Sequence, residues 1–397
     1  MKYLSSVVGV GLTAALLTAC GGAGNSLAPS TPVSTGVPEG RAHLAERPAS
    51  SGGLQYVYVT NFESNDVSAY TIGGSSGALT FLRTSGGTGT GPQIVAIDPT
   101  GKFAYAPNCY SDNVSSFAIE ASDGVLKPVK GRPVKTGYCP YGAAIDPAGT
   151  FIYVISYFDD DVSAYQITSS GALKPVKKSP FATGTDPEGS AIDPAGKFFY
   201  VANWTSNNVS AYAIDASSGA LTPVAGSPFA TDTGPFGLVV DPKGKFAYVS
   251  NESSNTVSAY TIDGSSGALT PVAGSPFAAG TEPDWVTVDP AGKFVYVVNE
   301  GSNNVSAYAI DASSGALTPV AGSPFAAGRG PDGVTVDSTG EFVYVVNFNS
   351  NNVSAYTIDA STGALTPVVG SPFAAGQEPS GISTCQGTGQ ACIPPPL

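Results

Sequence analysis

The sequence predicts an all-β protein: a seven-bladed β-propeller with four antiparallel strands in each blade. Two observations support this fold class. A six-residue run of the type Phe294–Asn299 occurs seven times, and the ends of successive copies are 47 or 48 residues apart. A fixed period of this length is typical of stacked supersecondary units. Each period also holds four short apolar runs between turns rich in Gly, Pro, Asn and Asp, without helical periodicity, which is the pattern of a propeller blade.

The chain begins with an expected export and lipidation signal. After a positive start, residues 7–17 form an apolar stretch that is too short to span a bilayer. Small residues then lead to Cys20, as in a bacterial lipobox, so residues 1–19 are expected to be a lipoprotein signal peptide and Cys20 the lipidated N-terminus. An ordinary signal peptide cut near Ala19 is the alternative. Gly21 after the cysteine favours the outer membrane of the cell envelope, facing the periplasm or the surface.

Residues 20–53 are rich in Gly, Ser and Pro and are expected to form a flexible tether. The single histidine of the chain, His43, lies in this segment. The formal net charge is −13, from 17 Lys and Arg against 30 Asp and Glu, and no basic run occurs. Nucleic acid is therefore not an expected partner.

One complete blade is illustrated by the period that starts at Pro283. Its four runs are residues 285–288, 294–298, 305–310 and 316–320, each ended by a turn. The tyrosines of the second and third runs and the recurrent Ser-Pro-Phe-Ala segments are expected to fill the space between blades. The Asn that ends the second run is expected to hold the following turn.

Counting the runs predicts how the ring closes. The propeller is expected to span residues 54–385, with a short C-terminal tail at 386–397. Residues 54–82 supply only the second, third and fourth runs of a blade, whereas residues 381–384 are a first run without followers. Pairing of these two segments would complete the seventh blade as a clasp and remove an open sheet edge.

The cysteines fit an oxidising compartment. Apart from Cys20, the chain has Cys109, Cys139, Cys385 and Cys392, which allow three connectivities. We favour Cys109–Cys139 and Cys385–Cys392, because neighbouring blades would bring the first pair together. A metal site is not expected at these cysteines, since no histidine lies near them and no C-x-x-C pair exists.

The repeated motifs carry a family resemblance. The F-x-Y-V-x-N runs, the D-P-x-G-K turns and the S-G-A-L-T-P runs resemble the YVTN-type propeller repeat. Residues 54–384 are similar to the lactonase family of seven-bladed propellers, whose best-known members open 6-phosphogluconolactone. The resemblance implies a polar pocket with His, Arg and acidic groups. In this chain the propeller segment has no His, and its arginines are Arg83, Arg132 and Arg329.

Function is expected where the blades differ, at the loops around the mouth of the central channel. The residues after the first-run proline and after the second run vary most, and Trp285 stands where five blades have Gly. These positions predict an acidic sector, with Glu252 near Asp284 and Glu300 near Asp332. The catalytic candidates are Glu252, Asp284, Glu300, Asp332 and Arg329. The candidate ligand-binding rim consists of Gln93, Tyr141, Glu188, Trp204, Phe236 and Trp285, with Tyr157 and Phe158 adding to its aromatic sector.

These residues suit a sugar, a peptide or a cation held by carboxylates. Residues 159–161, three successive aspartates, are a second candidate cation site, but they lack calcium-loop spacing and are better explained as a solvated turn. A Ser-His-Asp or Cys-His mechanism is excluded in the propeller because it has no His, and no phosphate loop or dinucleotide motif occurs.

The sequence therefore favours a lipid-anchored scaffold at the cell envelope that binds a protein, peptide or carbohydrate as a monomer. No cofactor and no bound metal are expected. The alternative is a lactonase-type carboxylic ester hydrolase that uses acidic residues and Arg on the rim.

Overall fold

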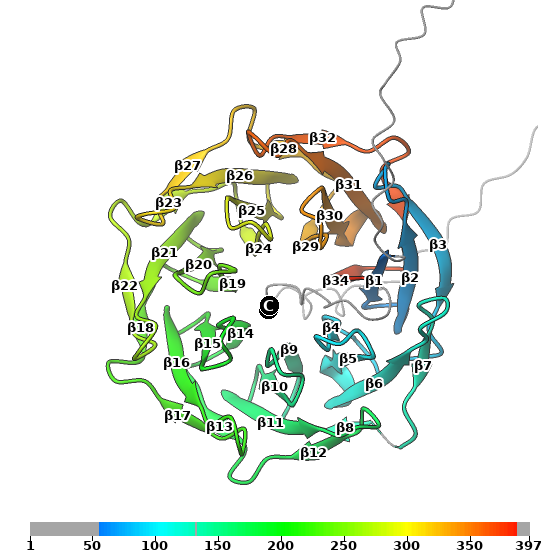
Figure 1. Cartoon of the computed structure of the whole chain (residues 1–397), viewed down its shortest axis with the longest axis vertical. Helices are drawn as coiled ribbons and strands as arrows, with labels where there is room; N and C mark the ends of the chain where they lie inside the picture. The colour runs from blue at the N-terminus through cyan, green and yellow to red at the C-terminus, as the bar shows by residue number, and fades with distance from the viewer. Residues whose placement is uncertain (1–54, 132, 387–397) are drawn as a thin grey trace, which may run out of the picture. The chain divides into compact units, whose positions relative to one another are not determined.

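The computed structural model describes residues 55–131 and 133–386. They form seven antiparallel β-sheets arranged as blades around a central axis (Figure 1). The all-β, seven-bladed prediction is thus confirmed. In the described residues, no helix is long and apolar enough to cross a membrane.

The first strand of each blade lies nearest the axis. These inner strands are β4 (Ala96–Ile97), β9 (Pro140–Ile145), β14 (Pro187–Ile192), β19 (Pro235–Val240), β24 (Pro283–Val288), β29 (Pro331–Val336) and β34 (Pro379–Gln386). The second strands are β5 (Phe103–Asn108), β10 (Phe151–Ser156), β15 (Phe198–Asn203), β20 (Phe246–Asn251), β25 (Phe294–Asn299), β30 (Phe342–Asn347) and, in blade 7, β1 (Gln55–Asn61).

The two outer strands follow in the same order in every blade. The third strands are β6 (Asn113–Ile119), β11 (Asp161–Ile167), β16 (Asn208–Ile214), β21 (Thr256–Ile262), β26 (Asn304–Ile310), β31 (Asn352–Ile358) and β2 (Asp66–Ile72). The fourth strands are β7 (Leu126–Pro128), β12 (Leu173–Pro175), β17 (Leu221–Pro223), β22 (Leu269–Pro271), β27 (Leu317–Pro319), β32 (Leu365–Pro367) and β3 (Leu79–Thr84).

Six blades contain a fifth, two-residue strand that the sequence did not predict. These strands are β8 (Val134–Lys135), β13 (Phe181–Ala182), β18 (Phe229–Ala230), β23 (Phe277–Ala278), β28 (Phe325–Ala326) and β33 (Phe373–Ala374). Each pairs with the start of the third strand, beyond the short fourth strand, as in the pairing of Val305 with Phe325. The Ser-Pro-Phe-Ala segment therefore extends the blade as well as packing beside it.

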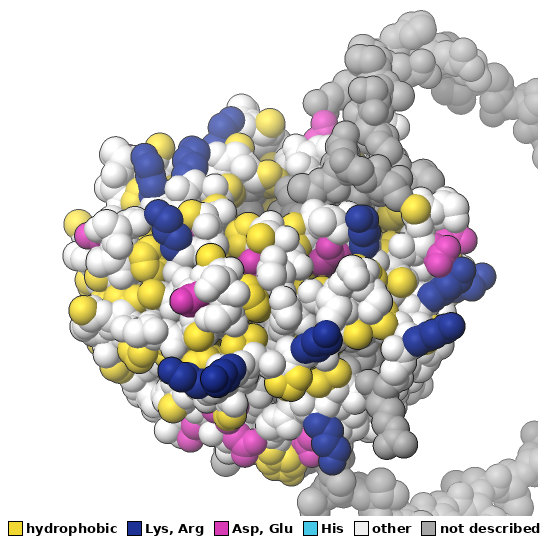
Figure 2. Space-filling model, turned by 60° about the horizontal axis from the view of Figure 1, so that its bottom comes forward, with side chains coloured by type: hydrophobic (Ala, Val, Ile, Leu, Met, Phe, Trp, Pro, Cys, Tyr) yellow, Lys and Arg dark blue, Asp and Glu magenta, His cyan; other side chains and the backbone are white. Residues whose placement is uncertain are grey.

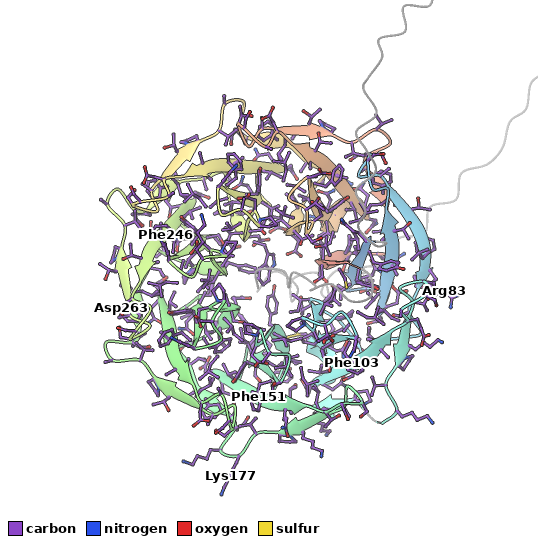
Figure 3. The ribbon with its side chains drawn as sticks, in the orientation of Figure 1. Arg83, Phe103, Phe151, Lys177, Phe246 and Asp263 are labelled. Atoms are coloured by element: carbon purple, nitrogen blue, oxygen red, sulfur yellow. A yellow bond between two sulfur atoms is a disulfide. The ribbon has the colours of Figure 1, made fainter. Side chains whose placement is uncertain are left out.

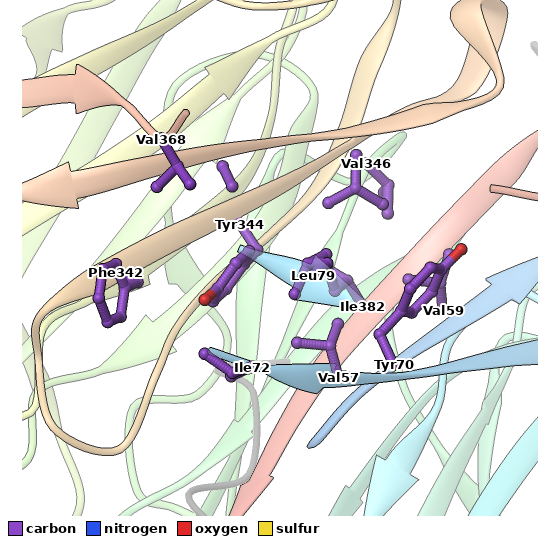
Figure 4. Packing of buried hydrophobic residues seen from close by; sticks show 12 residues of the cluster. Val57, Val59, Tyr70, Ile72, Leu79, Phe342, Tyr344, Val346, Val368 and Ile382 are labelled. Carbon is purple, nitrogen blue, oxygen red and sulfur yellow. The ribbon is translucent and has the colours of Figure 1, made fainter. Parts of the chain in front are cut away.

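The seventh sheet joins the two ends of the described chain. Its strand order is β3-β2-β1-β34, and β34 pairs antiparallel with β1, with Val59 opposite Ile382. The apolar core between blades 6 and 7 includes Ile382, Val57 and Tyr344, all at most 5% exposed (Figure 4). Within the described residues, the last strand thus fills the inner position that the first three strands leave open.

Tyrosines of the second strands link each blade to the next. The Tyr248 hydroxyl donates a hydrogen bond of 3.1 Å to the Gly315 carbonyl, which is 67 residues further along the chain. The equivalent bond occurs in all seven blades, and the one from Tyr344 to Gly77 crosses the junction between blades 6 and 7. The hydroxyls of these buried tyrosines therefore satisfy turn carbonyls while their rings pack in the core, as the repeat predicts.

Candidate functional site

The loops that carry the variable residues lie together on one face of the ring, which we call the rim face. The Glu300 N–H, directly after a second strand, donates to the Glu282 carbonyl in the loop that precedes the inner strand of the same blade. The Glu282 N–H in turn donates over 2.7 Å to the side chain of Asn255, in the preceding blade. The equivalents of both bonds occur in every blade. The sequence-predicted positions thus share one surface.

Because all blades have a similar shape, neighbouring inner strands lie close together just below this face. A Cβ added at Gly142 would lie 2.8 Å from the Glu188 carbonyl oxygen, and one added at Gly237 would lie 2.7 Å from the Asp284 carbonyl oxygen. A side chain at either position would therefore force the neighbouring inner strand to shift. Trp285, which occupies the equivalent position in blade 5, is only 5% exposed and packs its ring edge-to-face on Phe236 at 5.8 Å.

Three carboxylates meet on the rim face. Glu252, Asp284 and Glu300 each place one oxygen within 4.8 Å of the others, and we call them the acidic trio. Asp284 is 2% exposed, whereas the other two are half-buried. The expected proximity of Glu252 and Asp284 is confirmed, and Glu300, which the sequence placed near Asp332, joins them.

Trp204 orients one member of the trio. Its indole Nε1–H donates a 2.7 Å hydrogen bond to Oε2 of Glu252, which is 48 residues further along the chain and in the next blade. This hydrogen bond fixes the orientation of the Glu252 carboxylate group. The sequence named both residues as rim candidates but did not predict their bond.

An unbroken series of aromatic contacts borders the trio. The rings follow the order Tyr138, Phe158, Tyr157, Tyr141, Phe236, Trp285, with centroid separations of 5.0, 4.8, 6.0, 6.0 and 5.8 Å. We call these six residues the aromatic strip. It starts at exposed rings, Tyr138 at 56% and Phe158 at 43%, and ends at buried ones. Tyr138 was not among the rim candidates predicted from the sequence. An aromatic residue there could have served as a signal, because the equivalent loop position holds a polar residue or Arg in the other blades.

Tyr157 connects the aromatic strip to the acidic groups. Burial is the main cause that raises the pKa of its phenol, and the carboxylates of Glu188, Asp186, Glu252 and Asp160 raise it further. The hydroxyl therefore stays protonated at neutral pH and can donate a hydrogen bond. Glu188 is itself 4% exposed, so another carboxyl group is held in this region.

The spacing of the trio suits two kinds of chemistry. Neighbouring carboxyl groups can act as acid and base in catalysis, and three carboxylate oxygens can also bind a divalent cation.

Several predicted site residues lie outside the trio. Arg329 is exposed, and its guanidinium donates a hydrogen bond of 3.5 Å to the backbone carbonyl of Asn349. Asp332 is buried at the equivalent position of blade 6. Gln93 is buried in blade 1, where its backbone carbonyl accepts a hydrogen bond from the Thr60 hydroxyl. A catalytic role for Arg329 or Asp332 and a binding role for Gln93 stay predictions.

The three successive aspartates at residues 159–161 take part in local structural contacts. The Asp159 carboxylate accepts the Tyr138 N–H at 2.7 Å, and that of Asp160 accepts the Asp186 N–H at 2.9 Å. Burial raises the pKa of Asp161, the first residue of β11. The interpretation of this segment as a turn therefore fits its contacts.

A disulfide bond joins Cys109 to Cys139 across blades 1 and 2, as predicted. The bond connects the loop after β5 to the loop before β9. The loop after β5 contains the 3₁₀ turn η2 (Cys109–Ser111). Blade 6 has a similar turn, η3 (Phe348–Ser350). Cys385 is also disulfide-bonded. Its expected partner Cys392, like Cys20 and His43, lies outside the described residues.

Comparisons with known proteins agree with this architecture. The family model described as "Lactonase, 7-bladed beta-propeller" matches residues 30–141, 138–233 and 225–382. No curated protein matches the sequence.

Three solved structures show the same fold. Proteins provisionally named 6-phosphogluconolactonase come from Bacteroides uniformis (20% identity, TM-score 0.74, covering 84% of this chain and 99% of that one) and Bacteroides fragilis (21%, 0.75, 85% and 99%). The third is a periplasmic gluconolactonase from Pseudomonas aeruginosa (19%, 0.72, 83% and 99%). At these identities the likeness shows the fold alone.

Proposed function

This chain belongs to the lactonase family of seven-bladed β-propellers, and from that premise we propose that it hydrolyses sugar-derived lactones at the acidic trio. The observation that carries the proposal is the convergence of three carboxylates within 4.8 Å on the rim face. The sequence alone favoured a binding scaffold, because the propeller has no His. The family match supports hydrolysis better, and carboxylates can supply the acid–base groups that His supplies elsewhere.

The proposed reaction needs two proton transfers. One carboxylate of the trio takes a proton from a water molecule, whose oxygen attacks the lactone carbonyl carbon. The tetrahedral intermediate then collapses, and the bond between the carbonyl carbon and the ring oxygen breaks. A second carboxyl group of the trio, acting as the general acid, protonates that ring oxygen. The product is a hydroxy acid, and the two carboxyl groups have exchanged roles.

The surrounding residues have supporting roles in this proposal. Asp284, the most buried member of the trio, is the candidate base, while the Trp204 indole holds Glu252 in place. The protonated Tyr157 hydroxyl is the candidate donor to the oxyanion that forms during attack. The aromatic strip offers apolar ring faces for the C–H side of a sugar lactone.

The proposal predicts that the purified propeller accelerates hydrolysis of at least one lactone. The assay measures acid release from a panel of aldono-1,5-lactones, aldono-1,4-lactones and simple γ-lactones, each corrected for its spontaneous rate. Heat-denatured protein is the control. Saturable turnover is expected for a sugar lactone. A folded protein that accelerates none of the panel would refute hydrolysis and return the scaffold role to first place.

We also propose that the chain works in the cell envelope, anchored through Cys20. The support is the lipobox-like segment before Cys20 and the disulfide bond between Cys109 and Cys139, which fits an oxidising compartment. Mass spectrometry of the mature protein should find an acylated N-terminal Cys20. An unmodified N-terminus further along the chain would show that the protein is released instead.

A further inference from the structure

We propose that the rim face selects uncharged lactones and discriminates against phosphorylated ones. The catalytic part of this inference rests on the proposed lactone hydrolysis, whereas the binding part can be tested without turnover. The charges of the described residues at this face differ from those expected of an enzyme that holds a phosphate group.

Several negative charges lie together where a ligand would bind. The acidic trio contributes three carboxyl groups within 4.8 Å, and the buried Glu188 adds to the same negative field at Tyr157. A phosphate monoester carries up to two negative charges at neutral pH. Because half-buried charges are poorly screened, each carboxylate would oppose such a group over several ångströms.

Most positive charges lie elsewhere on the ring; the exception is Arg329, which is exposed in the rim-face loop that precedes β29. Inner strands start at the rim face, so the turns at their far ends, which carry Lys197, Lys245 and Lys293, lie on the opposite face. Arg83 and Lys177 extend from the outer edge, away from the axis (Figure 3). Figure 2 shows Lys and Arg side chains in several small groups that are distributed over the visible face.

Backbone N–H groups of the rim loops are also engaged. Arg329 is a single side chain, so a phosphate site on this face would also need several N–H groups pointed at the anion. In this chain the loop N–H of Glu282 donates to Asn255, and that of Glu300 donates to the Glu282 carbonyl. All seven blades repeat both bonds, so these groups hold the loops together rather than face a ligand.

The same field would assist release of the product. Hydrolysis turns a neutral lactone into a carboxylate, so the ligand gains a negative charge beside the trio. Repulsion then weakens binding of the acid relative to its lactone. We therefore expect weak product inhibition together with rejection of phosphate esters.

Tryptophan fluorescence provides the test, because the only two tryptophans of the chain, Trp204 and Trp285, both lie at this site. The probes are D-glucono-1,5-lactam, a neutral analogue that resists hydrolysis, its 6-phosphate ester and D-gluconate. We expect saturable quenching by the lactam, with the two anions binding at least about tenfold more weakly at low salt. At 0.5 M NaCl the difference should shrink, because salt screens the repulsion.

Two variants make the test specific. Glu300→Gln removes one charge of the trio and should narrow the affinity difference between the lactam and its phosphate ester. Glu378→Gln removes a carboxylate from the loop before β34, on the rim face of blade 7, and should leave the difference unchanged.

Equal or tighter binding of the phosphate ester would overturn the inference, as would no quenching by any probe. Selective binding of the lactam without hydrolysis of any lactone would support the inference while refuting the proposed hydrolase.

Discussion

Replacing Asp284 by Asn should lower kcat for lactone hydrolysis by about 10²–10⁴-fold, the usual contribution of a positioned acid–base group. Asp284 is the most buried carboxylate of the trio and lies between Glu252 and Glu300 in the chain and within 4.8 Å of both. An amide keeps its shape but cannot take a proton from water. Because substrate contacts are largely retained, KM should change much less than kcat.

Glu378→Gln is again the control for loss of a rim-face carboxylate, because Glu378 lies in blade 7 and is not part of the acidic trio. The kcat of this variant should stay within about twofold of the value for the unchanged protein. Circular dichroism should show both variants folded. If both Asp284→Asn and Glu378→Gln retained full activity, the trio would not be the catalytic centre. Asp332 and Arg329 would then become the next candidates.

Replacing Ile382 by Asp should destabilise the propeller by about 4 kcal/mol or more, because it buries an unpaired charge in an apolar core. Ile382 is 5% exposed and sits opposite Val59 in the sheet that unites the first and last strands (Figure 4). Closure of the ring depends on this pairing, so soluble yield should fall and urea should unfold any remaining protein at a much lower concentration.

Ser380→Asp is the matched control for this variant. It places the same side chain in the same strand, at the position where blades 5 and 6 carry buried aspartates, Asp284 and Asp332. The change removes the Ser380 hydrogen bond to the Pro92 carbonyl, so a smaller loss of stability is expected. If urea unfolded the two variants at similar concentrations, packing between blades 6 and 7 would contribute less to the stability of the propeller than the buried core there indicates.

The sequence was most informative about features that repeat. The period of the Phe294–Asn299 runs, the count of first runs and the alternation within strands predicted the blade number and the strand order. Such patterns are local, since each strand and turn is specified by its own residues. The Cys109–Cys139 pair could also be predicted, because a fixed repeat places equivalent loops of adjacent blades side by side.

The short fifth strands were missed for an equally physical reason. Only two residues of each Ser-Pro-Phe-Ala segment pair with the third strand, as at Phe325–Ala326. A strand of that length has no periodicity to detect, and it forms only because the third strand extends beyond the fourth.

What the sequence determined by itself was the architecture and the surface on which function would lie. Only the tertiary structure decided which rim residues meet: that Glu300 joins Glu252 and Asp284, that Trp204 holds Glu252 across 48 residues, and that Arg329 stays exposed. Repetition places equivalent Cα atoms at equivalent positions. Side-chain length, rotamer and the identity of the neighbour in the next blade then determine contacts, and these variables belong to pairs of residues that are distant in the chain.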